Sequence, residues 1–182
     1  MQIDQTPRDI ELVMQSVVTK TRDYFETEHH TAIIDVDLGV DSMPSPPLLD
    51  MTAIIGLGGL VNVQAVFSFQ ASLVNAVYAW MTVGFNDPPE AVEKHREAAI
   101  GELVNTVLGL CTKDLQHLDR RGIPMTPPII VKQPCALATL NDSVFCTHSL
   151  LSAHGRLNIS LIGAPKSENK TSSPPINHHD NE

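Results

Sequence analysis

The chain has 182 residues, 42% of them hydrophobic, and a formal net charge of −9. This length suits one domain with a substantial core, and the negative charge argues against nucleic acid as a partner because it would repel a phosphate backbone. The sequence opens without a basic segment followed by an apolar run, and polar residues interrupt the apolar segment 51–85 before it reaches the roughly 20 residues that span a membrane. We therefore expect a cytoplasmic protein with no membrane contact.

Helix and strand signals follow one another along the first half of the chain. Thr6 and Pro7 fit the N-cap and first position of a helix whose apolar residues recur at helical spacing as far as Phe25. Downstream, short β-rich runs are separated by Gly and Pro, which favour turns and loops. In chain order we expect a strand over 32–37, a proline-rich loop over 41–47, strands over 51–57 and 60–69 joined by a tight turn at Gly58-Gly59, and a second helix over 71–81.

A third and longer helix is predicted from Pro88 to about Leu118. Asp87 is its candidate N-cap, with Pro88 at the first helical position. Its end is marked by Arg120 and Arg121, which suit the negative end of the helix dipole, and by Gly122, which can adopt a left-handed conformation.

The last part of the chain predicts more sheet and then a tail. We expect strands over 129–132, 143–151 and 156–161, the last two joined by a turn at His154-Gly155. Residues 166–182 are polar and contain Pro174-Pro175, so we expect a disordered tail after a single domain over residues 1–165. This order of hairpins and amphipathic helices predicts an α+β fold in which an antiparallel sheet packs against helices.

The third helix has two contrasting faces. One is broad and apolar, and consists of Ile100, Leu103, Val104, Val107, Leu108, Cys111, Leu115 and Leu118. The opposite face carries Ala98, Glu102, Asn105, Gly109 and Gln116, with Gly101 and Thr106 at its flanks. Each glycine inside a helix costs about 1 kcal/mol relative to Ala. One explanation is that a partner surface approaches closely around Glu102 and Asn105; the other is that these two are ordinary solvated residues and the glycines serve helix packing.

A family resemblance favours the first explanation. The run 99–105 (Ala-Ile-Gly-Glu-Leu-Val-Asn), with Gly109 four residues on, resembles the E-x-x-N helix of the CheX, CheC and FliY chemotaxis phosphatases. The segment Thr126-Pro127-Pro128 and the glycine-rich hairpin at 55–59 are similar to further features of that family, and the resemblance covers roughly residues 8–163. A single E-x-x-N site resembles the CheX branch.

The resemblance implies a protein phosphatase that hydrolyses the aspartyl phosphate of a CheY-type response regulator. Asn105 would orient the attacking water, and Glu102 would pair with the lysine of the receiver domain. Partner-binding positions would be Ala98, Gly101, Thr106 and Gly109. The family also implies a homodimer and no cofactor of the chain's own, because the magnesium ion belongs to the receiver.

Other functions are weighed against this one. A non-catalytic module of the same fold could dock a receiver domain or a flagellar component without turnover. An enzyme with its own nucleophile finds little support, since Cys111, Cys135 and Cys146 lie among apolar neighbours, which indicate buried thiols in a reducing compartment. Adjacent histidines at 29–30 and 178–179 are expected on a loop and a tail, without the fixed geometry of a metal site.

Overall fold

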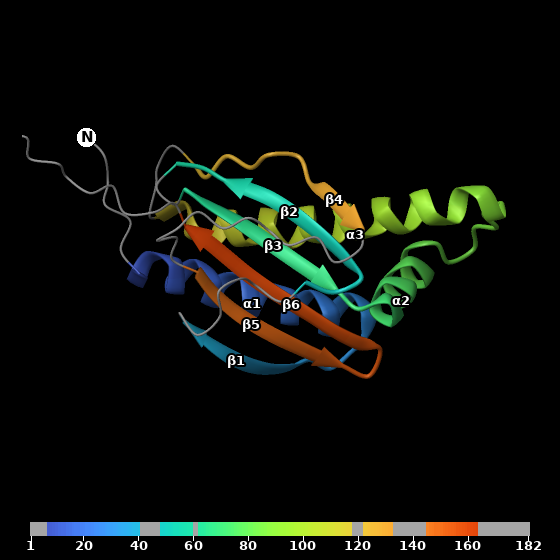
Figure 1. Cartoon of the computed structure of the whole chain (residues 1–182), viewed down its shortest axis with the longest axis horizontal. Coiled ribbons are helices and arrows are strands. Elements are labelled where there is room, and N and C mark those ends of the chain that lie inside the picture. Colours follow the sequence, from blue (N-terminus) through green and yellow to red (C-terminus); the bar gives the residue numbers. More distant parts are fainter. Residues whose placement is uncertain (1–6, 41–47, 60–61, 118–121, 133–144, 164–182) are drawn as a thin grey trace, which may run out of the picture.

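The computed structural model describes residues 7–40, 48–59, 62–117, 122–132 and 145–163. In chain order the elements are α1 (Pro7–His29), β1 (Ile34–Val40), β2 (Met51–Leu57), β3 (Val63–Phe69), α2 (Ala71–Met81), α3 (Pro89–Asp114), the 3-10 turn η1 (Leu115–His117), β4 (Ile129–Lys132), β5 (Phe145–Ser152) and β6 (Gly155–Gly163). The strands form one antiparallel sheet in the order β1-β5-β6-β3-β2-β4. Helices α1 and α3 lie across the same face of this sheet, and α2 lies at one end (Figure 1). The predicted α+β architecture is confirmed.

Several elements coincide with the sequence prediction. Helix α2 and the strands β2 and β4 have the predicted bounds. The turn between β2 and β3 contains Gly59 at φ 79°, a left-handed conformation that favours glycine. The turn between β5 and β6 lies at Ala153-His154, one residue earlier than predicted, and Gly155 begins β6 at φ 137°.

The start of α3 differs from the prediction. The helix begins at Pro89 with Pro88 as N-cap, and no side chain caps it. Asp87 does not serve as the N-cap because its Oδ2 atom accepts a hydrogen bond from the hydroxyl of Tyr78 at 2.8 Å and lies 2.7 Å from Nδ1 of His95. These partners come from α2 and from the second turn of α3, so they hold the connection between the two helices.

The end of α3 also lies earlier than predicted. The helix ends at Asp114 and continues as η1 to His117. Gly122 has the expected left-handed φ of 79°. Arg120 and Arg121 lie outside the described residues, as do Thr6, the loop 41–47 and the tail 166–182.

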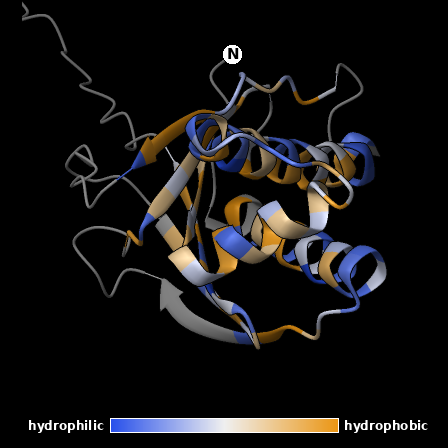
Figure 2. Ribbon diagram, turned by 90° about the vertical axis from the view of Figure 1, so that its right-hand side faces the viewer, coloured by the Kyte–Doolittle hydropathy of each residue, from blue (hydrophilic) through white to orange (hydrophobic). Residues whose placement is uncertain are grey.

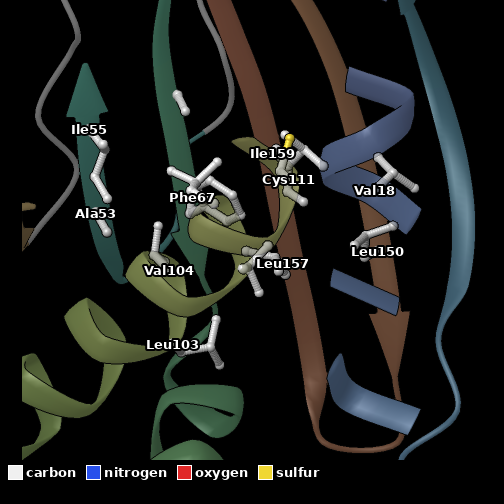
Figure 3. Packing of buried hydrophobic residues seen from close by; sticks show 14 of the residues in the cluster. Val18, Ala53, Ile55, Phe67, Leu103, Val104, Cys111, Leu150, Leu157 and Ile159 are labelled. Carbon is white, nitrogen blue, oxygen red and sulfur yellow. The ribbon is translucent and has the colours of Figure 1, made fainter. Parts of the chain in front are cut away.

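The core fills the space between the helices and one face of the sheet. Figure 3 shows Leu103 and Val104 of α3 in the same cluster as Ala53, Phe67 and Leu157 of the strands, with Val18 of α1 near Leu150. Each of these side chains is buried. Figure 2 shows the same two layers edge-on, with the helices on one side of the sheet.

The other face of the sheet carries buried polar side chains that bond to one another across the strands. The pairs are Thr52–Ser68 at 2.8 Å, Ser149–Asn158 at 2.9 Å and Thr147–Ser160 at 2.9 Å. Buried hydroxyl and amide groups are stable only when they are hydrogen-bonded, so these pairs favour a single strand register. Asn158 is part of a glycosylation-type sequence, but its side chain is buried in this row.

Candidate functional site

The predicted division of α3 into two faces is found in the structure. Of the eight predicted apolar-face residues, the seven from Ile100 to Leu115 are buried, and Leu118 lies outside the described residues. The opposite side of the helix faces away from the sheet. Because the buried side of α3 packs toward the sheet, its other side faces outward (Figure 2).

Glu102 and Asn105 lie together on this outer side. They are three residues apart, so their side chains project about one turn from each other in neighbouring directions. Glu102 is exposed and Asn105 is partly exposed. Within the described part of the chain, neither side chain has a hydrogen bond or an ion pair. A carboxylate and a carboxamide are therefore offered side by side to an external group.

The other predicted contact positions differ in their surroundings. Ala98 is exposed, and Thr106 and Gly109 are partly exposed. A Cβ atom added at Gly109 would have no neighbour within 4 Å among the described residues, so this glycine faces open space. Ala98, Thr106 and Gly109 thus border Glu102 and Asn105 on the accessible side of the helix.

Gly101 is buried on the flank of α3 that faces the segment before β4. A Cβ atom at this position would lie 3.5 Å from Cγ of Pro128. The structure therefore gives Gly101 a packing role against Pro128, and its contact with a partner stays a prediction.

The segment that carries Pro128 is fixed to the sheet by hydrogen bonds to β2. The amide of Thr126 donates to the carbonyl of Gly56 at 3.0 Å, and the hydroxyl of Thr126 accepts from the Gly56 amide at 2.9 Å. A Cβ atom at Gly56 would lie 3.1 Å from the Thr126 side chain, so glycine permits this close approach. Gly56, Thr126 and Pro128 together support the flank of α3 from which Glu102 and Asn105 project.

Lysines from other elements pair with carboxylates near both ends of α3. Lys132 of β4 lies 3.1 Å from Glu93 and also pairs with Glu97. Lys20 of α1 lies 2.6 Å from Asp114. The hydrogen bond from Lys132 lowers the pKa of Glu93, against the opposing effect of burial. These pairs tie α3 to β4 and to α1 and leave Glu102 as the unpaired carboxylate between them among the described residues.

Tyr24 of α1 lies beside this surface, and the sequence analysis did not select it. Burial raises the pKa of its phenol, and the negative charges of Glu28 and Glu102 raise it further. The sequence does carry a signal for this position, because Ser16, Lys20 and Tyr24 recur every four residues along one side of α1. That spacing could not show which element the stripe would face.

The cysteine and histidine candidates lie in packed surroundings instead of an accessible site. Cys111 and Cys146 are buried, and burial raises the pKa of the Cys111 thiol. His29 is the last residue of α1 and not part of a loop as predicted, and its ring stacks on Trp80 at 4.4 Å between centroids.

Among the described residues there is no cluster of three or more His, Cys, Asp or Glu side chains that could hold a metal ion. No helix in the described ranges combines the length and the apolar character needed to cross a bilayer.

Comparisons with solved structures show where this fold occurs. A chemotaxis protein CheX from Desulfovibrio desulfuricans superposes with a TM-score of 0.70 at 16% identity, over 84% of this chain and 99% of that one. A chain of the CheX–CheY–BeF3–Mg²⁺ complex from Borrelia burgdorferi gives a TM-score of 0.64 at 17% identity, over 86% and 97%. FliY from Thermotoga maritima gives 0.59 at 14% identity, over 88% and 92%. At these identities the likeness shows a shared fold.

Comparison at the level of sequence shows the family. The sequences of curated proteins give no match. A family model described as chemotaxis phosphatase CheX matches residues 51–147, just over half of the chain, and this range includes the whole of α3 with Glu102 and Asn105. The chain therefore belongs to the CheX family of chemotaxis phosphatases.

Proposed function

We propose that this protein hydrolyses the aspartyl phosphate of a CheY-type response regulator, with Glu102 and Asn105 inserted into the active site of the receiver domain. The observation that carries the proposal is the pair itself. A carboxylate and a carboxamide stand three residues apart on the accessible side of a helix whose other side is buried, and neither has a partner among the described residues. The CheX family and the CheX–CheY complex of similar fold support a CheY-type receiver as the partner.

Asn105 would act by orientation. A carboxamide is not a base at neutral pH, but it offers both donors and an acceptor, so it can hold a water molecule in line with phosphorus. The water oxygen forms the new bond to phosphorus, the bond between phosphorus and the aspartyl oxygen breaks, and the products are inorganic phosphate and the free carboxylate. Correct placement of a nucleophile is worth several kcal/mol in favourable cases. The metal ion of this reaction would belong to the receiver.

Glu102 would act by anchoring the helix. Its carboxylate would pair with the lysine of the receiver active site, and a charge-assisted hydrogen bond of this kind is stronger than a neutral one. Because Glu102 and Asn105 share one rigid helix, this contact would also set the position of Asn105 relative to phosphorus. Glu102 therefore contributes mainly to binding, and Asn105 to the chemical step.

The test is the rate at which a purified, phosphorylated CheY-type regulator loses phosphate. The wild-type chain in catalytic amounts should accelerate this loss, and Asn105→Ala should abolish the acceleration while it keeps affinity for the regulator. The fold should be unaffected because Asn105 is not part of the core. An Asn105→Ala variant with wild-type turnover would refute the assigned role.

A non-catalytic binding module is the alternative, and the same assay separates the two. A module that only docks would bind the regulator without any acceleration, or would slow the loss of phosphate by covering the receiver active site. The presence of both motif residues on the accessible side favours turnover.

We also propose that the protein forms a homodimer through its sheet. The outer strands β1 and β4 pair on one side only among the described strands, and each carries an exposed isoleucine, Ile34 at 66% and Ile129 at 62%. An unpaired strand edge with apolar side chains is a ready template for pairing. Light scattering at micromolar concentration should give twice the mass of the chain; the mass of a monomer would count against the proposal.

A further inference from the structure

Helix α1 runs alongside α3 and contributes one edge of the surface around Glu102. The two helices are antiparallel across the sheet (Figure 1). Lys20 of α1 forms its ion pair with Asp114 of α3, so the side of α1 that carries Lys20 faces α3. Because the two helices are antiparallel, the residues that follow Lys20 lie alongside the part of α3 that precedes Asp114.

This alignment places Tyr24 beside the part of α3 that follows Glu102. Tyr24 follows Lys20 by four residues, which is about 6 Å along a helix axis. The same step back along α3 from Asp114 reaches Leu110. Glu102 lies about two turns further along α3, and its negative charge raises the pKa of the Tyr24 phenol. On the helical wheel Tyr24 lies between the core-facing side of α1 and the side that carries Ser16 and Lys20, so it points toward α3.

The ring of Tyr24 is held in place, but its hydroxyl is free to bind. The ring packs against the hydrophobic core and contacts the ring of His29 edge-on at 5.3 Å between centroids. Part of the side chain is exposed, and the hydroxyl has no hydrogen bond to any described residue. An aromatic side chain that is already ordered loses little conformational entropy on binding, which is one reason why tyrosine is frequent in interfaces.

We propose that Tyr24 is a docking residue, so that the surface that receives the response regulator extends from α3 onto α1. The ring would contact the receiver protein along the flank of α3 that faces α1, and the hydroxyl would hydrogen-bond to a polar group at the rim of the receiver active site. The proposal rests on the proposed function for the identity of the partner. It adds a contact outside the E-x-x-N helix, and this contact would contribute to the choice among receivers.

A first experiment tests the geometry without any partner. The chain has two tyrosines, Tyr24 and Tyr78, so a Tyr78→Phe background leaves Tyr24 as the source of the tyrosinate absorbance. In that background, Glu102→Gln should lower the pKa of Tyr24, because it removes one of the charges that raise it. Glu11→Gln is the matched control: Glu11 is exposed on the N-terminal half of α1 and should leave the titration unchanged. An unchanged titration in Glu102→Gln would overturn the proposed placement.

A second experiment tests docking. Tyr24→Ala should weaken binding of a beryllofluoride-loaded CheY-type receiver roughly ten-fold, with a matching rise in KM and little change in kcat, as expected for an interface residue of this type. Tyr24→Phe keeps the ring and should lose about three-fold, which isolates the hydroxyl. Tyr78→Phe is the matched control because it removes the other tyrosine hydroxyl, whose partner is Asp87. That variant should bind the receiver like the wild type.

The outcomes separate this proposal from the proposed function. If both Tyr24 variants bind like the wild type while Asn105→Ala loses turnover, Tyr24 is not a docking residue and the proposed function stands. Should Tyr24→Ala fail to fold, Tyr24→Phe decides the question, because unchanged binding by that variant excludes the hydroxyl contact. A wild-type chain that neither binds nor dephosphorylates the receiver would overturn both proposals.

Discussion

Pro128 lies over Gly101, and the position that a Cβ atom on Gly101 would occupy is 3.5 Å from Cγ of the proline. This is an ordinary contact distance, so a methyl group fits there, and we expect a larger side chain to press against the proline ring. Thr126 binds the same segment to Gly56 of β2. The position of α3 against this segment therefore depends on two small residues, Gly101 in the helix and Gly56 in β2.

The first prediction follows from this contact. Gly101→Leu should destabilise the fold by about 1–3 kcal/mol. The leucine side chain would either displace Pro128 or be forced out of its own preferred rotamer. Gly109→Leu is the matched control: it places the same residue in the same helix where a Cβ atom has open space, and it should not lower stability. Chemical denaturation of the two variants gives the comparison. Equal losses of stability would show that Pro128 does not restrict the size of residue 101.

The second prediction concerns Glu102. Glu102→Ala should raise KM for the phosphorylated regulator by about ten-fold or more and lower kcat less, because it removes a charge-assisted contact with the receiver lysine. The loss of such a contact can cost a few kcal/mol when the lysine is left buried and unpaired. Glu90→Gln is the control, since Glu90 is an exposed carboxylate about 18 Å away along the same helix. It should leave both constants unchanged. A Glu102→Ala variant with unchanged KM would remove the anchoring role.

The sequence predicts well whatever depends on local patterns. Helical periodicity identifies the buried side of α3, and the glycine turn and β-rich runs locate β2, β3 and β4. The E-x-x-N motif then selects Glu102 and Asn105 on the accessible side.

Interactions between residues distant in the chain were not predictable in this way. The prolines after Asp87 predict a helix start with Asp87 as N-cap, but its carboxylate is engaged by side chains eight and nine residues away. Gly101 and Pro128 are 27 positions apart, and their contact depends on how β4 lies beside α3. Tyr24 belongs to another helix altogether, so only the packing of α1 against α3 reveals its position.

The third prediction concerns the pH dependence of stability. Hydrogen bonds from His95 and then from Tyr78 lower the pKa of Asp87 below its ordinary value of 3.8. Because the pKa of Asp87 is lower in the folded than in the unfolded chain, its ionised carboxylate stabilises the fold at any pH above the ordinary pKa of 3.8. This stabilisation is lost as the pH falls from 3.8 through the lower pKa of the folded chain. Asp87→Asn should therefore lower the melting temperature at neutral pH. The difference in melting temperature between this variant and the wild type should shrink as the pH falls below about 3.8.

Tyr78→Phe provides the control for this series. It removes one hydrogen bond to Asp87 and leaves the contact with His95, so its effect should be smaller than that of Asp87→Asn. A difference between Asp87→Asn and the wild type that stays constant across the acidic range would show that the carboxylate charge does not contribute.

The last prediction uses Gly109 to separate the stability of the isolated chain from its fit to a partner. Glycine is the poorer helix former by about 1 kcal/mol, and residue 109 has open space around it, so Gly109→Gln should raise the free energy of unfolding. The same side chain would stand about one turn from Asn105 on the side that must enter the receiver, so the variant should bind and dephosphorylate the regulator less well. Gly109→Ala is the matched control, because it gives the gain in helix propensity with far less bulk and should keep more of the activity. If Gly109→Gln retained full activity, the close insertion of this side of α3 into a partner would be refuted.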